Sequence, residues 1–328
     1  MRISTAPFLF FLLLTAEALS QSVDLVSYQE LPDPKPADKT SWSAVETGHH
    51  FSFTTADVRY RKHLVPDPSQ AQASWKANAW KGEKVYTQAL LWSISAMPQV
   101  KLSWSELRDD KGHTIPESRV SARFIRYVMT DGLNQEGNGC DKRPVGTYDS
   151  SLVADPIDII QVRDVPQQTA QPVWLSVVVP ATAVTGRYAG TLTATSPSMP
   201  KPIMLSYSID VQNRVLPAPK DWTFHLDLWQ NPYSVARVHG VNVWSKEHMD
   251  IMRPYTKMLA DAGQKSVTAT IINDPWQSQT EDVYGSMVKW TKKKDGTWAY
   301  DYTIFDQWVN YMTDLGIDTF INCYSMIP

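Results

Sequence analysis

The sequence contains little cysteine, little glycine and no excess of positive charge. Only Cys140 and Cys323 occur in 328 residues, and two cysteines so far apart favour neither a disulfide framework nor a zinc site. Glycine, at 14 residues, is too rare for a collagen-like or glycine-rich low-complexity chain. The net charge is -3 and no long lysine or arginine block occurs, so a nucleic acid is not an expected partner.

Several well-defined catalytic motifs are also missing from the sequence. It has no G-x-S-x-G nucleophile elbow, no phosphate-binding G-x-x-x-x-G-K-[ST] loop, no G-x-G-x-x-G fingerprint and no H-E-x-x-H pair. The adjacent His49 and His50 have no Cys, Asp or Glu at metal-ligand spacing. The sequence therefore predicts neither a cofactor nor a metal site.

Long apolar runs are absent except at the start of the chain. Arg2 is followed by an apolar run over residues 7–16 and by the small residues Ala18 and Ser20. This pattern is typical of a secretory signal over residues 1–20, cleaved before Gln21, and the run is too short to span a bilayer. We therefore expect an exported protein, periplasmic or extracellular, with no membrane span after signal removal.

The remaining sequence has the composition of a folded protein, with 43% hydrophobic and 20% charged residues. Over residues 21–215, short β-branched and aromatic segments alternate with polar turns, which predicts an antiparallel β-sandwich domain. The clearest predicted strands are Val85–Trp92, Gln99–Trp104, Arg123–Met129, Val173–Val179, Tyr188–Thr195 and Ile203–Val211. Within one of them, Tyr188, Leu192 and Ala194 are expected to face the core, and Thr191 and Thr193 to face outward.

A proline-rich connector over residues 215–220 marks a boundary, after which strands and helices alternate. The predicted strands are Trp222–Leu228, Ser266–Ile272 and Ile317–Tyr324. One predicted helix begins after Ser245 and contains Pro254, which should kink it or delay its start; another begins at Thr303, with Asp306 as a capping-box partner. Residues 216–328 therefore resemble the first three β/α units of a (β/α)8 barrel, so the predicted fold is multidomain, β plus α/β.

A β-hairpin is predicted as an insertion between the second strand and the second helix. Asp295 and Gly296 form a turn signal between two aromatic arms over residues 287–300. The lysine run at 292–294 is interpreted as a solvated turn rather than a binding patch.

Polar and aromatic residues follow each of the three predicted parallel strands. Ligands of such folds gather at the carboxyl ends of the strands. Amides and carboxylates can bind sugar hydroxyls, and flat rings can cover the apolar face of a pyranose. We therefore expect a carbohydrate site. Its candidate residues are Asp227, Trp229, Gln230, Asn231, Asn273, Asp274, Trp276, Asn322 and Tyr324. The alternative is that Trp229 and Trp276 fill the top of the barrel while the Asn and Asp residues build turns.

Three runs in the second part of the chain resemble the catalytic domain of glycoside hydrolase family 123: LDLWQNPYSVAR (226–237), MLADAGQKSVTATIINDPW (258–276) and YTIFDQWVNYMTDLGIDTFINCYSM (302–326). Residues 79–85 and the run VVVPATAVTGRYAGTLT (177–193) resemble the amino-terminal domain of that family. The resemblance implies an exo-acting β-N-acetylgalactosaminidase that acts on amino-sugar glycans. In that mechanism the 2-acetamido group of the substrate is the nucleophile, and a neighbouring Asp-Glu pair orients it and supplies the general acid.

No position of this sequence matches that acidic pair, which follows a later strand in the family. A full barrel takes about 250 residues, more than follow Val215 here. We therefore expect an incomplete barrel, an exposed edge at residues 317–324 prone to aggregation, and no activity from these 328 residues alone. Two other readings stay open, a non-catalytic carbohydrate-binding or adhesion protein, and a scaffold whose aromatic residues are all core.

Overall fold

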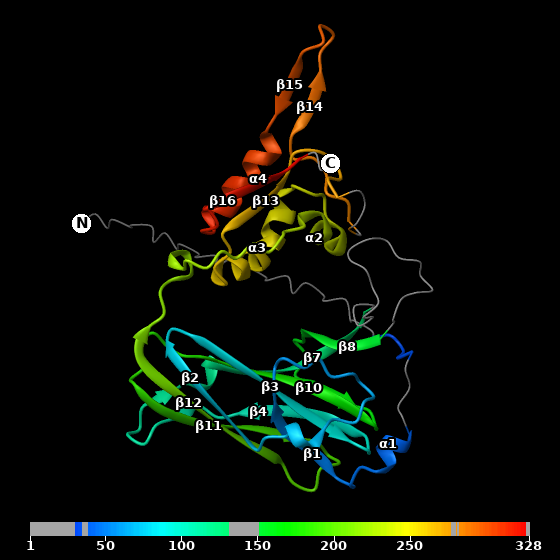
Figure 1. Cartoon of the computed structure of the whole chain (residues 1–328), viewed down its shortest axis with the longest axis vertical. Helices are drawn as coiled ribbons and strands as arrows, with labels where there is room; N and C mark the ends of the chain where they lie inside the picture. Colours follow the sequence, from blue (N-terminus) through cyan, green and yellow to red (C-terminus); the bar gives the residue numbers. More distant parts are fainter. Residues whose placement is uncertain (1–29, 35–38, 131–150, 277–279, 281, 326–328) are drawn as a thin grey trace, which may run out of the picture.

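The computed structural model describes residues 30–34, 39–130, 151–276, 280 and 282–325, and the predicted signal segment 1–20 lies outside them. Figure 1 shows two parts along the long axis of the molecule. The first part is made of β-sheets, and the second combines helices with short strands. The extended segment that contains η4 (Pro219–Asp221), a short 3-10 helix, connects them.

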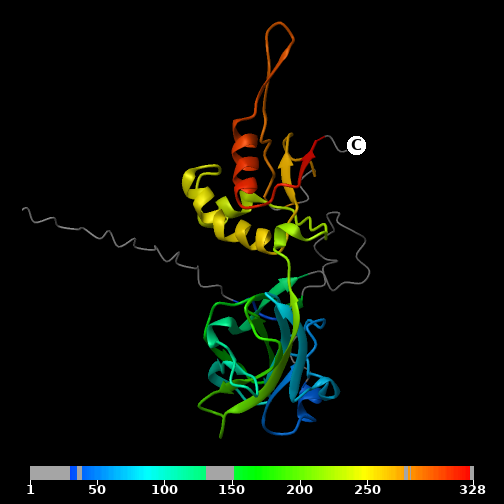
Figure 2. The same ribbon diagram turned by 90° about the vertical axis from the view of Figure 1, so that its left-hand side faces the viewer.

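The first part is a sandwich of two sheets (Figures 1 and 2). One sheet has the order β1-β3-β10-β7-β8, with β1 (His49–Thr54), β3 (Lys84–Ser93), β10 (Thr169–Val178), β7 (Val120–Thr130) and β8 (Ser151–Ile157). The other has the order β2-β12-β11-β4-β9, with β2 (Ser74–Lys81), β12 (Ile203–Val215), β11 (Gly186–Thr195), β4 (Met97–Trp104) and β9 (Val162–Val165). The short β5 (Leu107–Arg108) pairs with β11 and with β6 (Thr114–Ile115). The short helices α1 (Lys39–Ser43), η1 (Pro68–Gln70) and η2 (Glu117–Arg119) lie between strands.

The predicted β-sandwich is confirmed, with one exception to its antiparallel pairing. Strands β2 and β12 run parallel, from Ser206 opposite Ser74 to Val215 opposite Lys81. Segments so far apart in the chain can approach in either direction, whereas a tight turn would impose antiparallel pairing. All six predicted strands fall on observed ones, while β1, β2, β5, β6, β8 and β9 were not predicted.

Strand β11 shows how the alternating pattern builds the core. Tyr188, Leu192 and Ala194 are buried, as predicted, and Thr191 and Thr193 between them are partly exposed. Gly190 also faces inward, where an added Cβ would lie 3.1 Å from both Leu107 Cγ and the Tyr207 ring. A side chain at this position would require Leu107 or Tyr207 to shift by a few tenths of an ångström, so glycine suits the close approach of β5 and β12 to β11.

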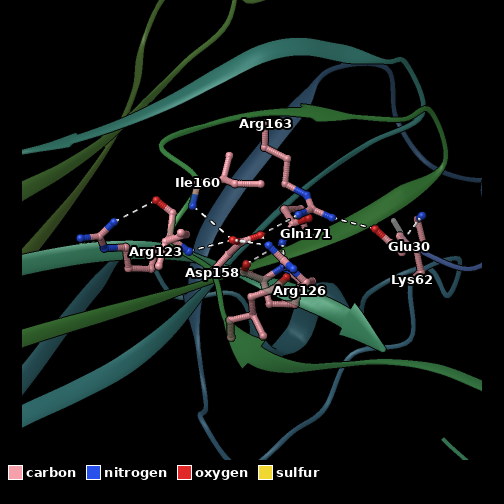
Figure 3. A network of polar contacts seen from close by, with 11 residues as sticks. Glu30, Lys62, Arg123, Arg126, Asp158, Ile160, Arg163 and Gln171 are labelled. Carbon is pink, nitrogen blue, oxygen red and sulfur yellow. Dashed lines mark hydrogen bonds and ion pairs between the residues drawn. The ribbon is translucent and has the colours of Figure 1, made fainter. Parts of the chain in front are cut away.

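A buried ionic network ties β7 to the segment after β8 (Figure 3). The Asp158 side chain is fully buried, and it accepts hydrogen bonds from Arg126 Nε and Nη2 at 3.0 and 2.8 Å and from Arg163 Nη1 at 3.4 Å. Arg163 also binds Glu30 at 2.8 Å, and Glu30 binds Lys62 at 2.8 Å. Because the carboxylate has several charged and backbone donors, its burial is compensated.

The pKa of Asp158 is lowered. Burial alone would raise it, but hydrogen bonds from Arg126 and from the backbone N–H groups of Ile160 and Ile159 outweigh burial. The ionised carboxylate therefore stabilises the fold at pH values above the unfolded pKa of about 3.9, and this contribution is lost as the pH falls through the lower folded pKa.

Asp158→Ala is expected to lower the free energy of unfolding by about 3–5 kcal/mol at neutral pH, because it leaves Arg126 and Arg163 without their shared carboxylate. Urea unfolding measures the change. The control Asp210→Ala removes an exposed partner of Arg187 and should cost less than about 1 kcal/mol. The Asp158→Ala protein should also lose less stability than the parent when the pH falls from about 5 to about 3, a range that includes the unfolded pKa of about 3.9. Equal losses of unfolding free energy in Asp158→Ala and Asp210→Ala at neutral pH would contradict the role of the buried carboxylate.

The second part contains helices packed on a small parallel sheet. Its elements are α2 (Pro232–His239), α3 (Lys246–Asp261), β13 (Ser266–Thr270), the hairpin β14 (Lys289–Lys292) and β15 (Trp298–Asp301), α4 (Thr303–Asp314) and β16 (Phe320–Tyr324). Strands β13 and β16 pair in parallel from Ser266 opposite Phe320 to Thr270 opposite Tyr324. Strand β13 is buried along its whole length, and its side chains form a core with α3 and α4 that includes Met252, Trp308 and Met312.

The first predicted strand of this part, Trp222–Leu228, is not a strand. A single parallel bridge joins Leu226 to Gln264, and the hydrogen bonds beyond it come from side chains. The Leu228 N–H donates to Gln264 Oε1 at 2.9 Å, and the Gln230 N–H donates to Thr268 Oγ1 at 3.2 Å. These side chains hold the segment beside β13 without a backbone ladder.

The predicted helices form, with differences at their ends. Ser245 caps α3 by accepting from the His248 N–H, and Pro254 does not delay the start of this helix. Helix α4 begins at Thr303 as predicted, but Asp301, rather than Asp306, accepts from the Thr303 N–H. Strand β16 begins three residues later than predicted, because the Ile317 N–H donates to the Met312 carbonyl and completes the end of α4. Helix α2 was not predicted.

Candidate functional site

Three of the predicted site aromatics meet beside the carboxyl ends of β13 and β16. The Trp229 ring lies 5.1 Å from Trp276 and 5.2 Å from Tyr324, and Trp276 lies 4.7 Å from Tyr324, measured between centroids. Trp229 follows the segment bridged to Gln264, Trp276 follows β13, and Tyr324 ends β16. Parallel pairing brings these strand ends to one edge, which we call the aromatic rim and define as Trp229, Trp276, Tyr284 and Tyr324.

Tyr284 belongs to the aromatic rim although the sequence analysis did not select it. Its ring lies 4.7 Å from Trp276, and its carbonyl accepts from the Asp274 N–H at 2.8 Å. Asp274 has a φ of 51°, a left-handed conformation that Asp tolerates better than most residues. The signal available in the sequence was the Asn273-Asp274-Pro275 turn, which returns the chain toward the end of β13.

The two tryptophans of the aromatic rim differ in exposure. Trp276 is 9% exposed and is packed between Tyr284 and Tyr324, whereas Trp229 is 56% exposed. Trp276 therefore supports the rim from within. Trp229 presents a ring to solvent, the arrangement that stacking on a ligand requires.

A polar pair lies beside the rings. Asn322 Nδ2 donates to Asp227 Oδ2 at 2.6 Å, joining the end of β16 to the segment after Leu226. Asp227 Oδ1 is buried and has no hydrogen-bond partner among the described residues. The pKa of Tyr324 is raised, first by burial and then by the negative charge of Asp227. A carboxylate oxygen without a donor favours a water or a ligand hydroxyl nearby.

Two other candidate residues have their polar groups occupied by the fold. Gln230 is 6% exposed; its Oε1 accepts from the Thr268 N–H, and its Nε2 donates to the Leu228 and Ser266 carbonyls. Asn231 caps α2 by accepting from the Tyr233 and Ser234 N–H groups, and its Nδ2 donates to the Asp282 carbonyl. Asn273 is exposed on the turn after β13. The structure thus joins Asp227, Trp229, Trp276, Asn322 and Tyr324, and gives Gln230 and Asn231 local structural roles.

A cavity of about 190 Å³ lies next to the rim, lined by Trp229, Gln230, Pro232, Met252, Tyr255 and Trp308. It is smaller than the range of about 300–1,000 Å³ that holds drug-sized ligands. The exposed ring of Trp229 therefore has a hollow on one side, and a larger ligand would lie over the open rim.

The described residues contain no group of three His, Cys, Asp or Glu side chains placed to hold a metal ion. None of their helices combines the length and apolar character needed to cross a membrane.

Comparison with known proteins defines the class of the chain. Residues 53–196 match the glycoside hydrolase 123 N-terminal domain, and residues 229–328 match the glycoside hydrolase 123 catalytic domain. These matches assign the chain to the glycoside hydrolases by resemblance. It is a family 123-like protein, similar to that family in both of its domains. No curated protein matches the chain.

A solved family 123 glycoside hydrolase from Clostridium perfringens, described for glycolipid glycan hydrolysis, has the same fold, with a TM-score of 0.76 and 24% identity. The match covers 86% of this chain and 49% of the other, so the chain spans about half the length of that relative. A PapD-like domain of human CEP192 has 14% identity over 57% of this chain and 95% of its own, with a TM-score of 0.25, too low to support any inference.

Trp276→Ala is expected to lower the free energy of unfolding by about 3–5 kcal/mol, because it removes a buried ring from between Tyr284 and Tyr324. Trp229→Ala should cost less than half as much, since over half of that side chain is already exposed. Urea unfolding followed by circular dichroism measures both. A Trp229→Ala loss equal to that of Trp276→Ala would show that both rings are core.

Proposed function

We propose that this chain is the sugar-binding portion of an exported glycoside hydrolase that acts on amino-sugar glycans. The observation that carries the proposal is the exposed Trp229 ring next to the hydrogen-bonded pair of Asp227 and Asn322. The family 123 similarity supports a carbohydrate ligand, and the C. perfringens relative is described as acting on glycolipid glycans.

In this proposal each residue of the candidate site has a distinct role. Trp229 stacks on the apolar face of a pyranose, while Trp276, Tyr284 and Tyr324 fix the position of its ring. Asp227 accepts from a sugar hydroxyl or an acetamide N–H, and its pairing with Asn322 fixes the carboxylate. Gln230 and Asn231, whose polar groups are already bonded, hold the backbone that carries Trp229.

The proposed reaction of the complete enzyme is exo-cleavage of a β-N-acetylgalactosaminide with retention. The carbonyl oxygen of the substrate's 2-acetamido group attacks C1 while a general acid protonates the leaving oxygen, and water then opens the cyclic intermediate. Such a reaction needs one carboxyl group to orient the acetamide and a second to act as acid. Asp227 is hydrogen-bonded to an amide rather than to a second carboxyl group, so we propose that these 328 residues bind the sugar without cleaving it.

The arrangement of the chain is part of the proposal. Residues 1–20 would be the export signal, directing the protein to the periplasm or outside the cell, and residues 21–215 the sandwich domain. Residues 216–328 would form the first β/α units of a (β/α)8 catalytic domain. The parallel pairing of β13 with β16, and the bridge from Leu226 to Gln264, support this arrangement.

A second candidate function is glycan binding without catalysis, as in a surface adhesion protein. One observation favours it: the rim offers an exposed ring and a fixed polar pair, which are sufficient for binding. The two functions differ in whether any longer form of the protein hydrolyses a glycoside.

Titration of the chain with N-acetylgalactosamine tests the site. Trp229→Ala and Asn322→Ala are each expected to weaken binding by about tenfold or more, since loss of a stacking ring or of the hydrogen bond that fixes a charged group removes about 1.5 kcal/mol. The control Asn310→Ala changes an exposed residue of α4 and should leave the affinity unchanged. Unchanged affinity in both Trp229→Ala and Asn322→Ala would refute the site.

A chromogenic β-N-acetylgalactosaminide tests catalysis separately. No release of the chromophore is expected from the 328 residues. Clear turnover would overturn the proposed lack of activity without affecting the binding result.

A further inference from the structure

The hairpin β14–β15 carries a row of aromatic side chains on one face. Trp290 lies opposite Tyr300, and Lys292 lies opposite Trp298, so these four side chains share a face of the ladder. The Trp290 ring centroid is 5.0 Å from Tyr300 and 6.2 Å from Trp298. Each of the three rings is nevertheless close to half exposed, at 46–48%. We call these four side chains the hairpin face.

The hairpin stands away from the rest of the protein in both views (Figures 1 and 2). The aromatic rings of the hairpin face therefore contribute little to the main core. They do stabilise the hairpin itself, because an isolated two-stranded hairpin is marginally stable and cross-strand aromatic pairs strengthen it. An exposed aromatic cluster of this size favours an interaction site.

The base of the hairpin is fixed to the edge that carries the aromatic rim. Trp290 Nε1 donates to the Ile271 carbonyl at 2.7 Å, directly after β13, and the Met287 N–H donates to the Thr270 carbonyl at 2.7 Å. The indole N–H of Trp290 is therefore occupied, and the faces of the rings are what the hairpin offers to a ligand.

The hairpin is positively charged in a chain whose net charge is -3. It contains Lys289, Lys292, Lys293 and Lys294 against Asp295 and Asp301. Both aspartates accept hydrogen bonds from nearby threonines, and these bonds lower both pKa values and occupy the carboxylates locally. No carboxylate of the described residues forms an ion pair with the lysines at 292–294, and Lys292 Nζ lies 5.9 Å from the Trp298 ring centroid.

We propose that the hairpin face is a second carbohydrate-binding surface, for an oligosaccharide that carries an anionic group, either carboxylate or sulfate. The rings supply stacking surfaces for pyranoses. The lysines at 292–294, which their sequence pattern alone assigns to a solvated turn, here supply the complementary charge beside those rings. The rings lie along the side of the hairpin while its tip is polar, from Lys292 to Thr297. That placement fits a chain lying along the face better than a tip inserted into a membrane. The hairpin face shares no residue with the aromatic rim, so an experiment can refute sugar binding at one site without refuting it at the other.

Binding of defined oligosaccharides to the full chain tests the proposal. The probes are a chondroitin sulfate hexasaccharide, a hyaluronan hexasaccharide and a neutral chitin hexasaccharide, with phosphatidylserine vesicles as a membrane probe. At least one anionic probe should bind at least tenfold more tightly than the neutral one. Both anionic probes carry carboxylates and only chondroitin sulfate carries sulfate, so tighter binding of chondroitin sulfate than of hyaluronan identifies sulfate, and equal binding of the two identifies the carboxylate. Equal binding of all three sugars, no binding of either anionic sugar, or binding of the vesicles alone would overturn the proposal.

Variants locate the binding on the hairpin face. Trp298→Ala should weaken binding of the anionic probe at least tenfold, and joint replacement of Lys292, Lys293 and Lys294 by Gln should remove its preference over the neutral probe. Thr291→Ala, on the opposite face of β14, should leave this binding unchanged. Circular dichroism and melting temperature show whether each variant is folded. Full binding by a folded Trp298→Ala protein would refute the assignment.

Discussion

The aromatic rim depends on the parallel pairing of β13 with β16. This pairing places Thr270 opposite Tyr324, so the turn after β13 and the last residue of β16 lie at the same edge. The third component, the segment carrying Asp227 and Trp229, reaches that edge by a different means. Its backbone N–H groups donate to the side chains of Gln264 and Thr268, and its own Gln230 side chain accepts from the Thr268 N–H of β13. Side-chain amides and a hydroxyl thus replace a strand ladder.

The same edge holds polar groups whose burial would be unfavourable without hydrogen-bond partners supplied by the fold. Asn322 and Asp227 come from segments far apart in the chain, and their 2.6 Å hydrogen bond forms only when β16 lies near the segment after Leu226. Trp276 is buried against Tyr284 and Tyr324, which leaves Trp229 as the most exposed ring of the aromatic rim. In the sandwich, the buried Asp158 shows the same principle, because its charge is tolerated where arginines and backbone donors converge.

Local patterns in the sequence predicted much of the fold. Alternation in β11, the Asp295-Gly296 turn and the Ser245 cap each act over a few residues, and each forms as expected. The misses have different physical causes. The segment 222–228 has the composition of a strand, but beyond the single bridge at Leu226 it is bound by the Gln264 side chain of a distant segment. At the start of α4 the competitor is local, because Asp301 rather than Asp306 accepts from the Thr303 N–H. Tyr284 was missed because a turn at Asp274, rather than a strand end, brings it to the rim.

The sequence by itself determined the β-sandwich, the helices α3 and α4, the strands β13 and β16, the hairpin and the resemblance to family 123. Hydrophobic periodicity and turn chemistry are properties of neighbouring residues. Only the tertiary structure decided which candidate residues share a site. It joined Asp227 to Asn322, exposed Trp229, buried Trp276, and assigned the amides of Gln230 and Asn231 to the backbone. These outcomes depend on groups that are distant in sequence and adjacent in space, because such groups determine which side chains are buried and which polar atoms find a hydrogen-bond partner.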